Sequence, residues 1–246
     1  MTVIYGRRIF VRLASLITLC VALALGSVGM AAPSKENVVL YFDFEQIAEN
    51  RMVEATGKTG IGSIKGQITL VEGVRGKAGQ FTPYSFIDVG ALDPDAIPTD
   101  EITIMAWVNV PPGTHEIFNA RGSDGTWIFH PELRSDGRYR WLVRTENAHT
   151  VFDMQTGVVA WNTWTHFAGV YSATAGYAAL YINGEEIARQ PVTGVPMMQD
   201  WGMGARVGLT IDDARPFSGR MDDLIVWNKA LTADEIKSAM EHGIGD

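Results

Sequence analysis

Three arginines on one short run are the residues of this chain best suited to binding chemistry. Arg138, Arg140 and Arg144 alternate with Tyr139 and Trp141, so an extended strand would place the arginines on one face and the aromatic rings on the other. Guanidinium groups pair bidentately with carboxylate or sulfate. If this face meets a ligand, the pattern predicts an acidic glycan. If it is an ordinary solvated face, the arginines only offset neighbouring acids.

Two tryptophans offer a second mode of binding. Trp127 and Trp201 lie close to glycine and aspartate residues, as stacking residues carried on loops often do. Indole rings stack on the apolar C–H faces of sugars. Both tryptophans are therefore candidate ligand-binding residues, and burial in the core is the alternative for each.

Carboxylates that could form a catalytic pair are scarce. Retaining glycoside hydrolases hold two of them on one face, and here Asp43 and Glu45 stand two residues apart without a third carboxylate. The chain also lacks a Gly-x-Ser-x-Gly elbow, a His-Glu-x-x-His motif and a phosphate loop. His166 lies inside an apolar run, which favours a core position. We therefore expect no enzyme.

The first 32 residues have the layout of an export signal. Arg7, Arg8 and Arg12 precede an apolar run over 13–25 that is short for a membrane span. The arginine pair fits a twin-arginine signal, and the same residues would serve the general secretory route. The expected organisation is a signal peptide at 1–32, a linker at 33–37 and a secreted or periplasmic domain at 38–246.

Cysteine content and charge exclude several kinds of site and partner. Cys20 is the only cysteine and lies in the leader, so the exported chain would have no disulfide and no thiolate metal site. Without the leader, 17 basic residues stand against 28 acidic ones, a net charge of −11 with histidine neutral. Such a surface repels phosphate backbones and anionic lipid. We expect no nucleic-acid partner and no membrane insertion of the mature chain.

Short apolar or alternating runs separated by Gly, Pro, Asn and Asp fill the rest of the chain. They predict an all-β, antiparallel β-sandwich. Asn183-Gly184 between two such runs predicts a tight hairpin. Thr232 and Glu235 form a capping box that begins a short C-terminal helix, and Gly243 ends it. The expected strands cover 38–44, 68–71, 86–89, 102–110, 127–130, 138–145, 150–154, 165–171, 178–182, 186–190, 205–209 and 220–228.

Six segments carry a family pattern when they are taken in order. They are YFDFE at 41–45, GKAGQF at 76–81, ITIMAWV at 102–108, WTHFAGVY at 164–171, LYINGEE at 180–186 and FSGRMDD at 217–223. In this order they resemble the strands of the laminin-G-like branch of the concanavalin A-like lectin/glucanase superfamily. The resemblance implies a jelly roll of two packed sheets, whose concave face or loop rim binds ligand in many relatives.

The resemblance also implies one structural calcium ion. Several of these jelly rolls hold calcium between a carboxylate near the first strand, carbonyls of a Gly-rich turn and an aspartate of the last strand. The matching positions are Asp43 or Glu45, a carbonyl near Gly73, and Asp222. Calcium tolerates irregular oxygen ligands from distant segments. The alternative is that Asp222 accepts backbone hydrogen bonds at a bulge while Asp43 is solvated.

The expected function is a secreted, non-catalytic binding module for carbohydrate or for a glycan-bearing protein. A fold alone does not define a function, so this expectation rests on analogy. A protein-interaction or cell-surface structural module without a sugar site is the alternative. A divergent glycoside hydrolase or lyase would need an acid and a base that the sequence does not offer.

Overall fold

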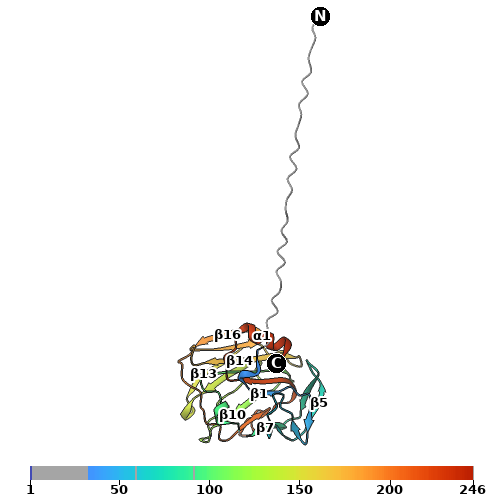
Figure 1. Cartoon of the computed structure of the whole chain (residues 1–246), viewed down its shortest axis with the longest axis vertical. Coiled ribbons are helices and arrows are strands. Elements are labelled where there is room, and N and C mark those ends of the chain that lie inside the picture. Colours follow the sequence, from blue (N-terminus) through green and yellow to red (C-terminus); the bar gives the residue numbers. More distant parts are fainter. Residues whose placement is uncertain (2–32, 59, 91, 246) are drawn as a thin grey trace.

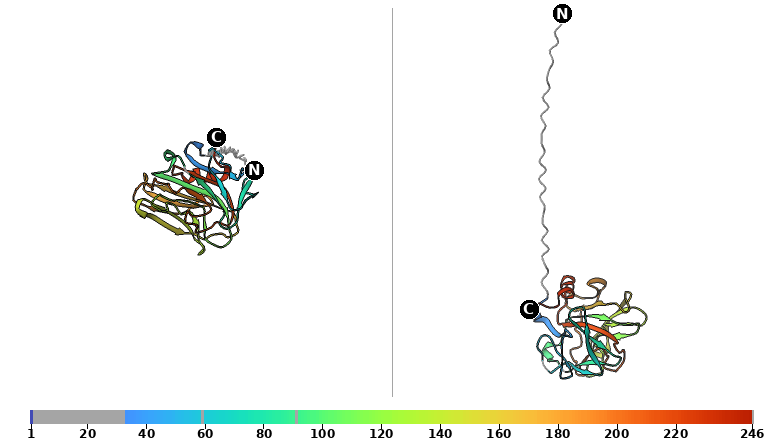
Figure 2. Two further views of the ribbon diagram at one scale, coloured as in Figure 1. Left: turned by 90° about the horizontal axis from the view of Figure 1, so that it is seen from below. Right: turned by 90° about the vertical axis from the view of Figure 1, so that its right-hand side faces the viewer.

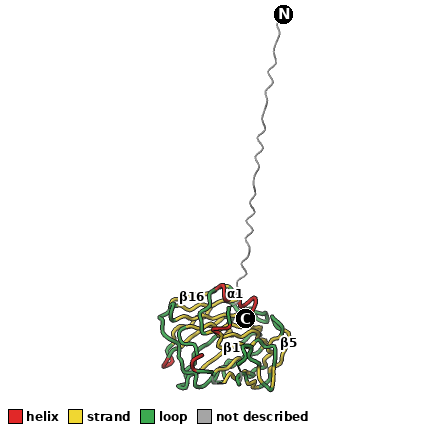
Figure 3. The backbone as a smooth tube through the Cα atoms, in the orientation of Figure 1, coloured by secondary structure: helices red, strands yellow, loops and turns green. Residues whose placement is uncertain are grey.

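The computed structural model describes residue 1 and residues 33–58, 60–90 and 92–245. These residues form an antiparallel β-sandwich, and strands and loops make up nearly all of it (Figure 3). The expected all-β sandwich with a short C-terminal helix is confirmed. The expected signal peptide lies outside the described residues, except for Met1.

The larger layer is a sheet of eight strands. In the Asn183-Gly184 hairpin both turn residues have positive φ, 52° and 78°, as a type I′ turn requires. The layer also contains β1 (Val38–Phe42), which pairs with the second half of β18 where β6 has ended. The order of the other strands is β16 (Glu185–Pro191), β15 (Tyr177–Ile182), β14 (Thr165–Ser172), β8 (Glu101–Asn109), β18 (Gly219–Trp227), β6 (Lys77–Phe81) and β5 (Ile68–Glu72).

Two smaller sheets form the other layer. Residues 127–130 join them, because the Ile128 amide donates to the Ala120 carbonyl and the His130 amide donates to the Leu142 carbonyl. One sheet has the order β10 (Phe118–Ala120), β17 (Ala205–Val207), β7 (Phe86–Gly90), β4 (Ser63–Lys65), β3 (Arg51–Met52) and β2 (Ile47–Ala48). The other has the order β13 (Thr150–Thr156), β12 (Tyr139–Arg144), β11 (Glu132–Leu133) and β9 (His115–Glu116).

The core lies between the layers, and a second apolar cluster lies under the helix. Ile104 and Val108 of β8 face the main core, whereas Met105 faces the second cluster. Helix α1 (Ala233–His242) covers that cluster and is closed by the expected capping box, with Gly243 at its end. Figure 1 shows α1 beside β16 and β14. Both faces of β8 are covered, as its apolar sequence requires.

The two ends of the described domain lie together. Residues 33–37, expected as a linker, are packed on the fold: Lys35–Asn37 form a short 3-10 helix, and Ser34 bridges Gly245. The Gly245 amide donates to the Pro33 carbonyl at 3.0 Å. Figure 2 shows the beginning of the domain beside the C-terminus. Two further 3-10 helices are Pro94–Ala96 and Glu146–Ala148.

Candidate functional site

The alternation expected for residues 138–144 is confirmed in β12. Trp141 is fully buried, and its Nε1 donates to the Val170 carbonyl across the interior at 2.9 Å. Arg138 is exposed, and Arg140 and Arg144 are partly exposed. The three arginines therefore lie on the outer face of the four-stranded sheet, away from the other layer.

Two of the three arginines are held by carboxylates of the protein itself. Arg138 forms an ion pair with Asp136 at 2.6 Å. Arg140 forms a two-pronged pair with Asp153, with both N–O distances 2.8 Å, and contacts Glu132 at 3.1 Å. These contacts match the interpretation in which such arginines offset neighbouring acids.

Arg144 differs because it makes no ion pair within the described part of the chain. Its Cζ lies 4.2 Å from the centre of the Trp127 ring, a cation–π contact. Arg215 lies 5.3 Å from the same ring. Burial, followed by the charge of Arg140, lowers the pKa of the Arg144 guanidinium from its ordinary value. Arg144, Trp127 and Arg215 are called here the arginine face, on which Arg144 has no acidic partner among the described residues.

A buried polar cluster lies behind this face, and sequence reasoning missed it. Glu116 and Glu132 are direct cross-strand partners, and His130 Nδ1 lies 2.8 Å from Glu116 Oε2. All three side chains are fully buried. Burial and the charge of Glu132 raise the pKa of Glu116 well above its ordinary value. Burial and nearby arginines, Arg215 first among them, lower the pKa of His130 to about 2, so its ring is neutral.

The ligand atoms of this cluster lie within 4.8 Å of one another, a spacing that a metal ion could use. The electrostatics oppose a cation there, because three guanidinium groups already contact Glu132. They belong to Arg134 at 2.7 Å, Arg140 at 3.1 Å and Arg215 at 3.0 Å. The ion pairs of buried Glu132 instead hold these arginine side chains in place on the outer face of the sheet.

Asp222, Glu45 and Gly73, three of the residues expected at a calcium site, meet around the turn between β5 and β6. Asp222 Oδ2 accepts hydrogen bonds from the amides of Val74 at 2.8 Å and Arg75 at 3.1 Å. Glu45 Oε1 accepts one from the amide of Lys77 at 2.8 Å. Carboxylates from the two ends of the domain therefore hold one turn.

Asp222 accepts these backbone hydrogen bonds at a register shift of β18, as the alternative to calcium expected. Asp222 is fully buried, and its Oδ1 has no hydrogen-bond partner. Burial, followed by the charge of Asp223, raises the pKa of Asp222 to about 7, and burial also raises the pKa of Asp43. A Cβ on Gly73 would lie 2.6 Å from Asp222 Oδ2, so the turn needs glycine. The unpartnered Oδ1 of Asp222 is the oxygen at this turn that a hard cation would contact.

Asp43 and Glu45 do not form a pair on one strand. β1 ends at Phe42, and Phe44 has a positive φ of 56°. Asp43 Oδ1 accepts a hydrogen bond from the Glu45 amide at 3.1 Å, as in a turn. The geometry that a two-carboxylate hydrolase places on a strand is therefore not formed by these two residues.

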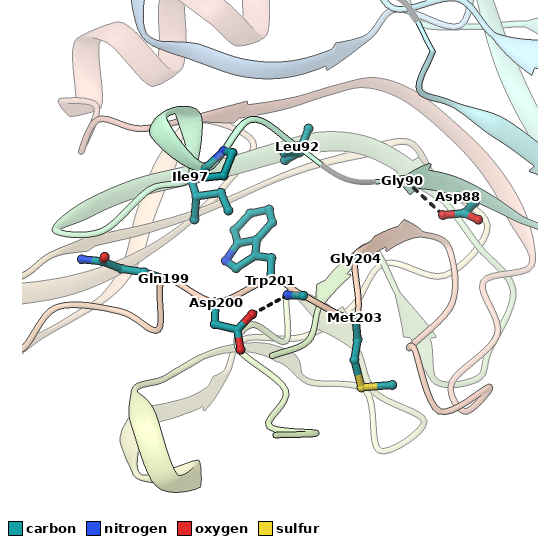
Figure 4. Close-up of a pocket in the computed structure, with 11 residues that line it drawn as sticks. Asp88, Gly90, Leu92, Ile97, Gln199, Asp200, Trp201, Met203 and Gly204 are labelled. Atoms are coloured by element: carbon teal, nitrogen blue, oxygen red, sulfur yellow. Dashed lines mark hydrogen bonds between the residues drawn. The ribbon is translucent and has the colours of Figure 1, made fainter. Parts of the chain in front are cut away.

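Trp201 lies apart from the arginine face. It is 6% exposed and packs on Phe118 and Phe129, with ring centres 5.9 and 5.4 Å away. An exposed stacking role on a loop is thus wrong for most of this ring, and its remaining surface lines a pocket (Figure 4). Trp127 is partly exposed, but Arg144 already covers its ring.

The fold and these contacts define a lectin-like β-sandwich. A laminin-G-type family model, described as the concanavalin A-like lectin/glucanases superfamily, matches residues 86–237. The chain belongs to this family. Among curated proteins it is similar to pentraxin-related protein PTX3 of Bos taurus, 29% identical over 91 residues, and of Homo sapiens, 28% identical over 89 residues. The first alignment covers 33% of this chain and 24% of the relative, and the second 32% and 23%.

Solved structures share the fold at low identity. The binding domain of Paraclostridial Mosquitocidal Protein 1 has a TM-score of 0.59 at 16% identity, over 84% of this chain and 52% of that one. The botulinum neurotoxin serotype G binding domain has 0.60 at 13%, over 83% and 51%. Domain 4 of AbnA, an arabinanase of Geobacillus stearothermophilus in complex with arabinotriose, has 0.55 at 19%, over 82% and 97%. Each of these neighbours is a binding domain or a domain of an extracellular enzyme. Within the described ranges, no helix combines the length and the apolar character that crossing a membrane requires.

Proposed function

We propose that the protein is a secreted or periplasmic binding module that recognises acidic carbohydrate, free or on a glycan-bearing protein, through the arginine face. The observation that carries this proposal is Arg144, a guanidinium beside Arg215 that has no acidic partner within the described residues of an acidic protein. An anionic sugar would supply the missing carboxylate or sulfate. The arabinotriose complex of the structurally similar AbnA domain supports carbohydrate as the ligand class.

The charges around this face support an anionic ligand. Burial, followed by the charge of Glu132, raises the pKa of Glu116 well above its ordinary value, which disfavours a negative charge on this carboxyl. The remaining acids are fewer than the arginines. The arginines are Arg134, Arg138, Arg140, Arg144 and Arg215, and the other acids are Glu132, Asp136 and Asp153.

We propose a non-catalytic role for the same residues. The two glutamates that face each other, Glu116 and Glu132, are fully buried, and arginines contact Glu132. A general acid or base must come within hydrogen-bond reach of the bond it acts on. A glycan bound outside the arginines would not reach these carboxylates.

The test compares Arg144 with a matched arginine that already has a partner. Binding of an oligogalacturonate is measured by calorimetry for the wild type, Arg144→Ala, Arg144→Lys and the control Arg138→Ala. Because a charge-assisted hydrogen bond contributes about 1.5–3 kcal/mol, we expect Arg144→Ala to weaken binding about tenfold or more. Arg144→Lys should keep only part of the lost affinity, and Arg138→Ala should change the affinity little.

Two further conditions make the result specific. The methyl-esterified oligosaccharide should bind equally to all variants, because it offers no carboxylate. Salt should weaken only the acidic ligand, since charges are screened over about 10 Å at 0.1 M. Equal oligogalacturonate binding by wild type and a correctly folded Arg144→Ala variant would contradict the proposal.

A protein-interaction module without a sugar site is the second candidate. The likeness to toxin binding domains favours it. A glycan array with and without calcium separates the candidates, because this module would bind no glycan on it.

We also propose that the protein holds one structural calcium ion. Asp222 Oδ1, a carboxylate of Asp43 or Glu45 and a carbonyl near Gly73 would supply oxygen ligands. The unpartnered, buried Oδ1 supports this proposal.

A further inference from the structure

A polar pocket of about 480 Å³ lies where three neighbouring strands of the eight-stranded sheet begin or end. Arg220 of β18 is paired with Gln80 of β6 on one side and with Asn109 of β8 on the other. These three side chains share the outer face of the sheet, because the adjacent residues Met221 and Val108 face the core. The rest of the lining comes from Pro111, Asn162, Ser218 and Gly219. This pocket is called here the Arg220 pocket.

The walls of the Arg220 pocket are held in place by contacts behind them. His115 Nδ1 accepts a hydrogen bond from the Ser218 amide at 3.2 Å, and its Nε2 donates to the Pro111 carbonyl at 2.9 Å. Burial lowers the pKa of His115, which favours the neutral ring that this pair of contacts requires. A Cβ on Gly219 would lie 2.3 Å from the Asn109 carbonyl oxygen, so glycine is needed there. The pocket is therefore preformed, which keeps the entropy cost of binding small.

Arg220 is the only charged side chain among the described residues that line the pocket. It forms no ion pair within the described part of the chain, and its one hydrogen bond is long, from Nε to Gln80 Oε1 at 3.4 Å. Asp222, two residues further along β18, is turned to the amides of Val74 and Arg75. The terminal nitrogens of Arg220 can therefore form the two-pronged pair that a guanidinium makes with a carboxylate.

Neutral polar groups beside Arg220 also lack partners. The side chains of Asn109, Asn162 and Ser218 make no hydrogen bond within the described ranges. The loop that carries Asn162 is fixed, because its backbone amide donates to the Val110 carbonyl at 2.8 Å. A primary amide donates and accepts hydrogen bonds as a peptide group does, and a hydroxyl can donate to a carboxylate. One cation with two amides and a hydroxyl thus matches one carboxylate that is followed by peptide groups.

We infer that the Arg220 pocket binds the free carboxyl end of a peptide chain. Arg220 pairs with the terminal carboxylate, and Ser218 donates to the same group. Asn109 and Asn162 exchange hydrogen bonds with the last peptide groups. The volume suits about two residues of an extended peptide. This pocket shares no residue with the arginine face, so the inference does not depend on the proposed glycan site.

The experiment titrates the whole protein with acetylated tripeptides that end in alanine, leucine or phenylalanine. Each peptide is used as the free acid and as the carboxyl-terminal amide, and binding is measured by ligand-observed NMR and calorimetry. The variants are Arg220→Ala, Arg220→Lys and Asn162→Asp, which places a carboxylate in the pocket. Asn162 has a positive φ of 56°, which aspartate also tolerates. Arg138→Ala is the matched control, because this exposed arginine already pairs with Asp136.

We expect at least one free-acid tripeptide to bind the wild type about tenfold or more tightly than its amide, because the amide cannot form the charge-assisted pair. Arg220→Ala should bind the acid as weakly as the amide and should leave amide binding unchanged. Arg220→Lys should keep only part of the difference. Asn162→Asp should weaken binding of the acid by repulsion between like charges, and Arg138→Ala should bind both peptides like the wild type.

The inference is overturned if no tripeptide binds, if acid and amide bind alike, or if a variant Arg220→Ala with the circular dichroism spectrum of the wild type keeps the difference between them. It is also overturned if acetate or inorganic phosphate binds as tightly as the tripeptides, because the pocket would then be a general anion site. Displacement of the tripeptide by trigalacturonate would likewise overturn it. Oligogalacturonate binding at the arginine face should be the same for wild type and Arg220→Ala, so either proposal can fail alone.

Discussion

Arg138, which precedes β12, and Arg140 and Arg144 within it have three different environments although they follow one sequence pattern. Strand alternation predicts their common face, and the structure confirms it. The partners depend on contacts that no local pattern contains. Asp153 reaches Arg140 through the pairing of β12 with β13, and Arg215 reaches Trp127 from a distant loop. The sequence therefore predicts the face but not that Arg144 alone of the three lacks an acid.

The buried carboxyl of Asp222 predicts how the stability of the protein depends on pH. The pKa of Asp222 is about 7 in the folded protein, above its ordinary value of 3.8, so the folded state keeps a proton that the unfolded state has lost. In chelator, the stability of the wild type relative to Asp222→Asn should therefore fall as pH rises from 4 to 8. At about 1.4 kcal/mol per pKa unit, the change is a few kcal/mol.

Urea unfolding at several pH values measures this difference. Asp136→Asn is the matched control: Arg138 lowers the pKa of that exposed carboxyl, so it is ionised in both the folded and the unfolded state over most of this range and its stability difference should stay nearly constant. Parallel stability curves for wild type and Asp222→Asn would contradict the prediction.

At the scale of elements, the long strands could be predicted, whereas most strands of two or three residues could not, with β17 inside the run expected at 205–209 as an exception. The runs expected at 102–110, 165–171 and 220–228 correspond to β8, β14 and β18 within about one residue at each end. β9 and β11 were missed because their residues are His, Glu and Leu, and buried polar side chains do not produce an apolar alternation. The buried cluster was missed for the same reason, although its His-x-Glu spacing at 130–132 is visible.

The capping box of α1 predicts a loss of stability when its threonine is replaced. Thr232 accepts from the Glu235 amide, and the Glu235 carboxylate accepts from the Thr232 amide at 2.8 Å. Thr232→Ala should cost about 1 kcal/mol of unfolding free energy, because it leaves amides at the helix start unsatisfied. Thr232→Ser keeps the cap and serves as the control. Urea unfolding of the two variants would contradict the prediction if alanine and serine behaved alike.

At the scale of the whole molecule, the first and last elements of the domain are joined without a disulfide, since Cys20 is the only cysteine of the sequence. Arg75 connects the ends: it donates to the Met240 carbonyl of α1 at 2.7 Å and pairs with Asp223 of β18 at 2.5 Å. Tyr41 of β1 donates to the same aspartate at 2.6 Å. First strand, last strand and helix thus meet beside the turn that Asp222 holds.

A calcium ion at this junction would stabilise the whole molecule. A ligand that binds only the folded state at 100 times its Kd adds about 2.7 kcal/mol. For a domain of this size that raises Tm by about 5–10 °C. The melting temperature of the wild type should therefore fall by this amount when calcium is replaced by chelator, whereas Asp222→Ala should melt lower and respond little. Dithiothreitol is the control and should change neither, because there is no disulfide to reduce. A wild-type Tm that is the same in calcium and in chelator would remove the calcium proposal and leave the sandwich, with its apolar core, as the sole source of stability.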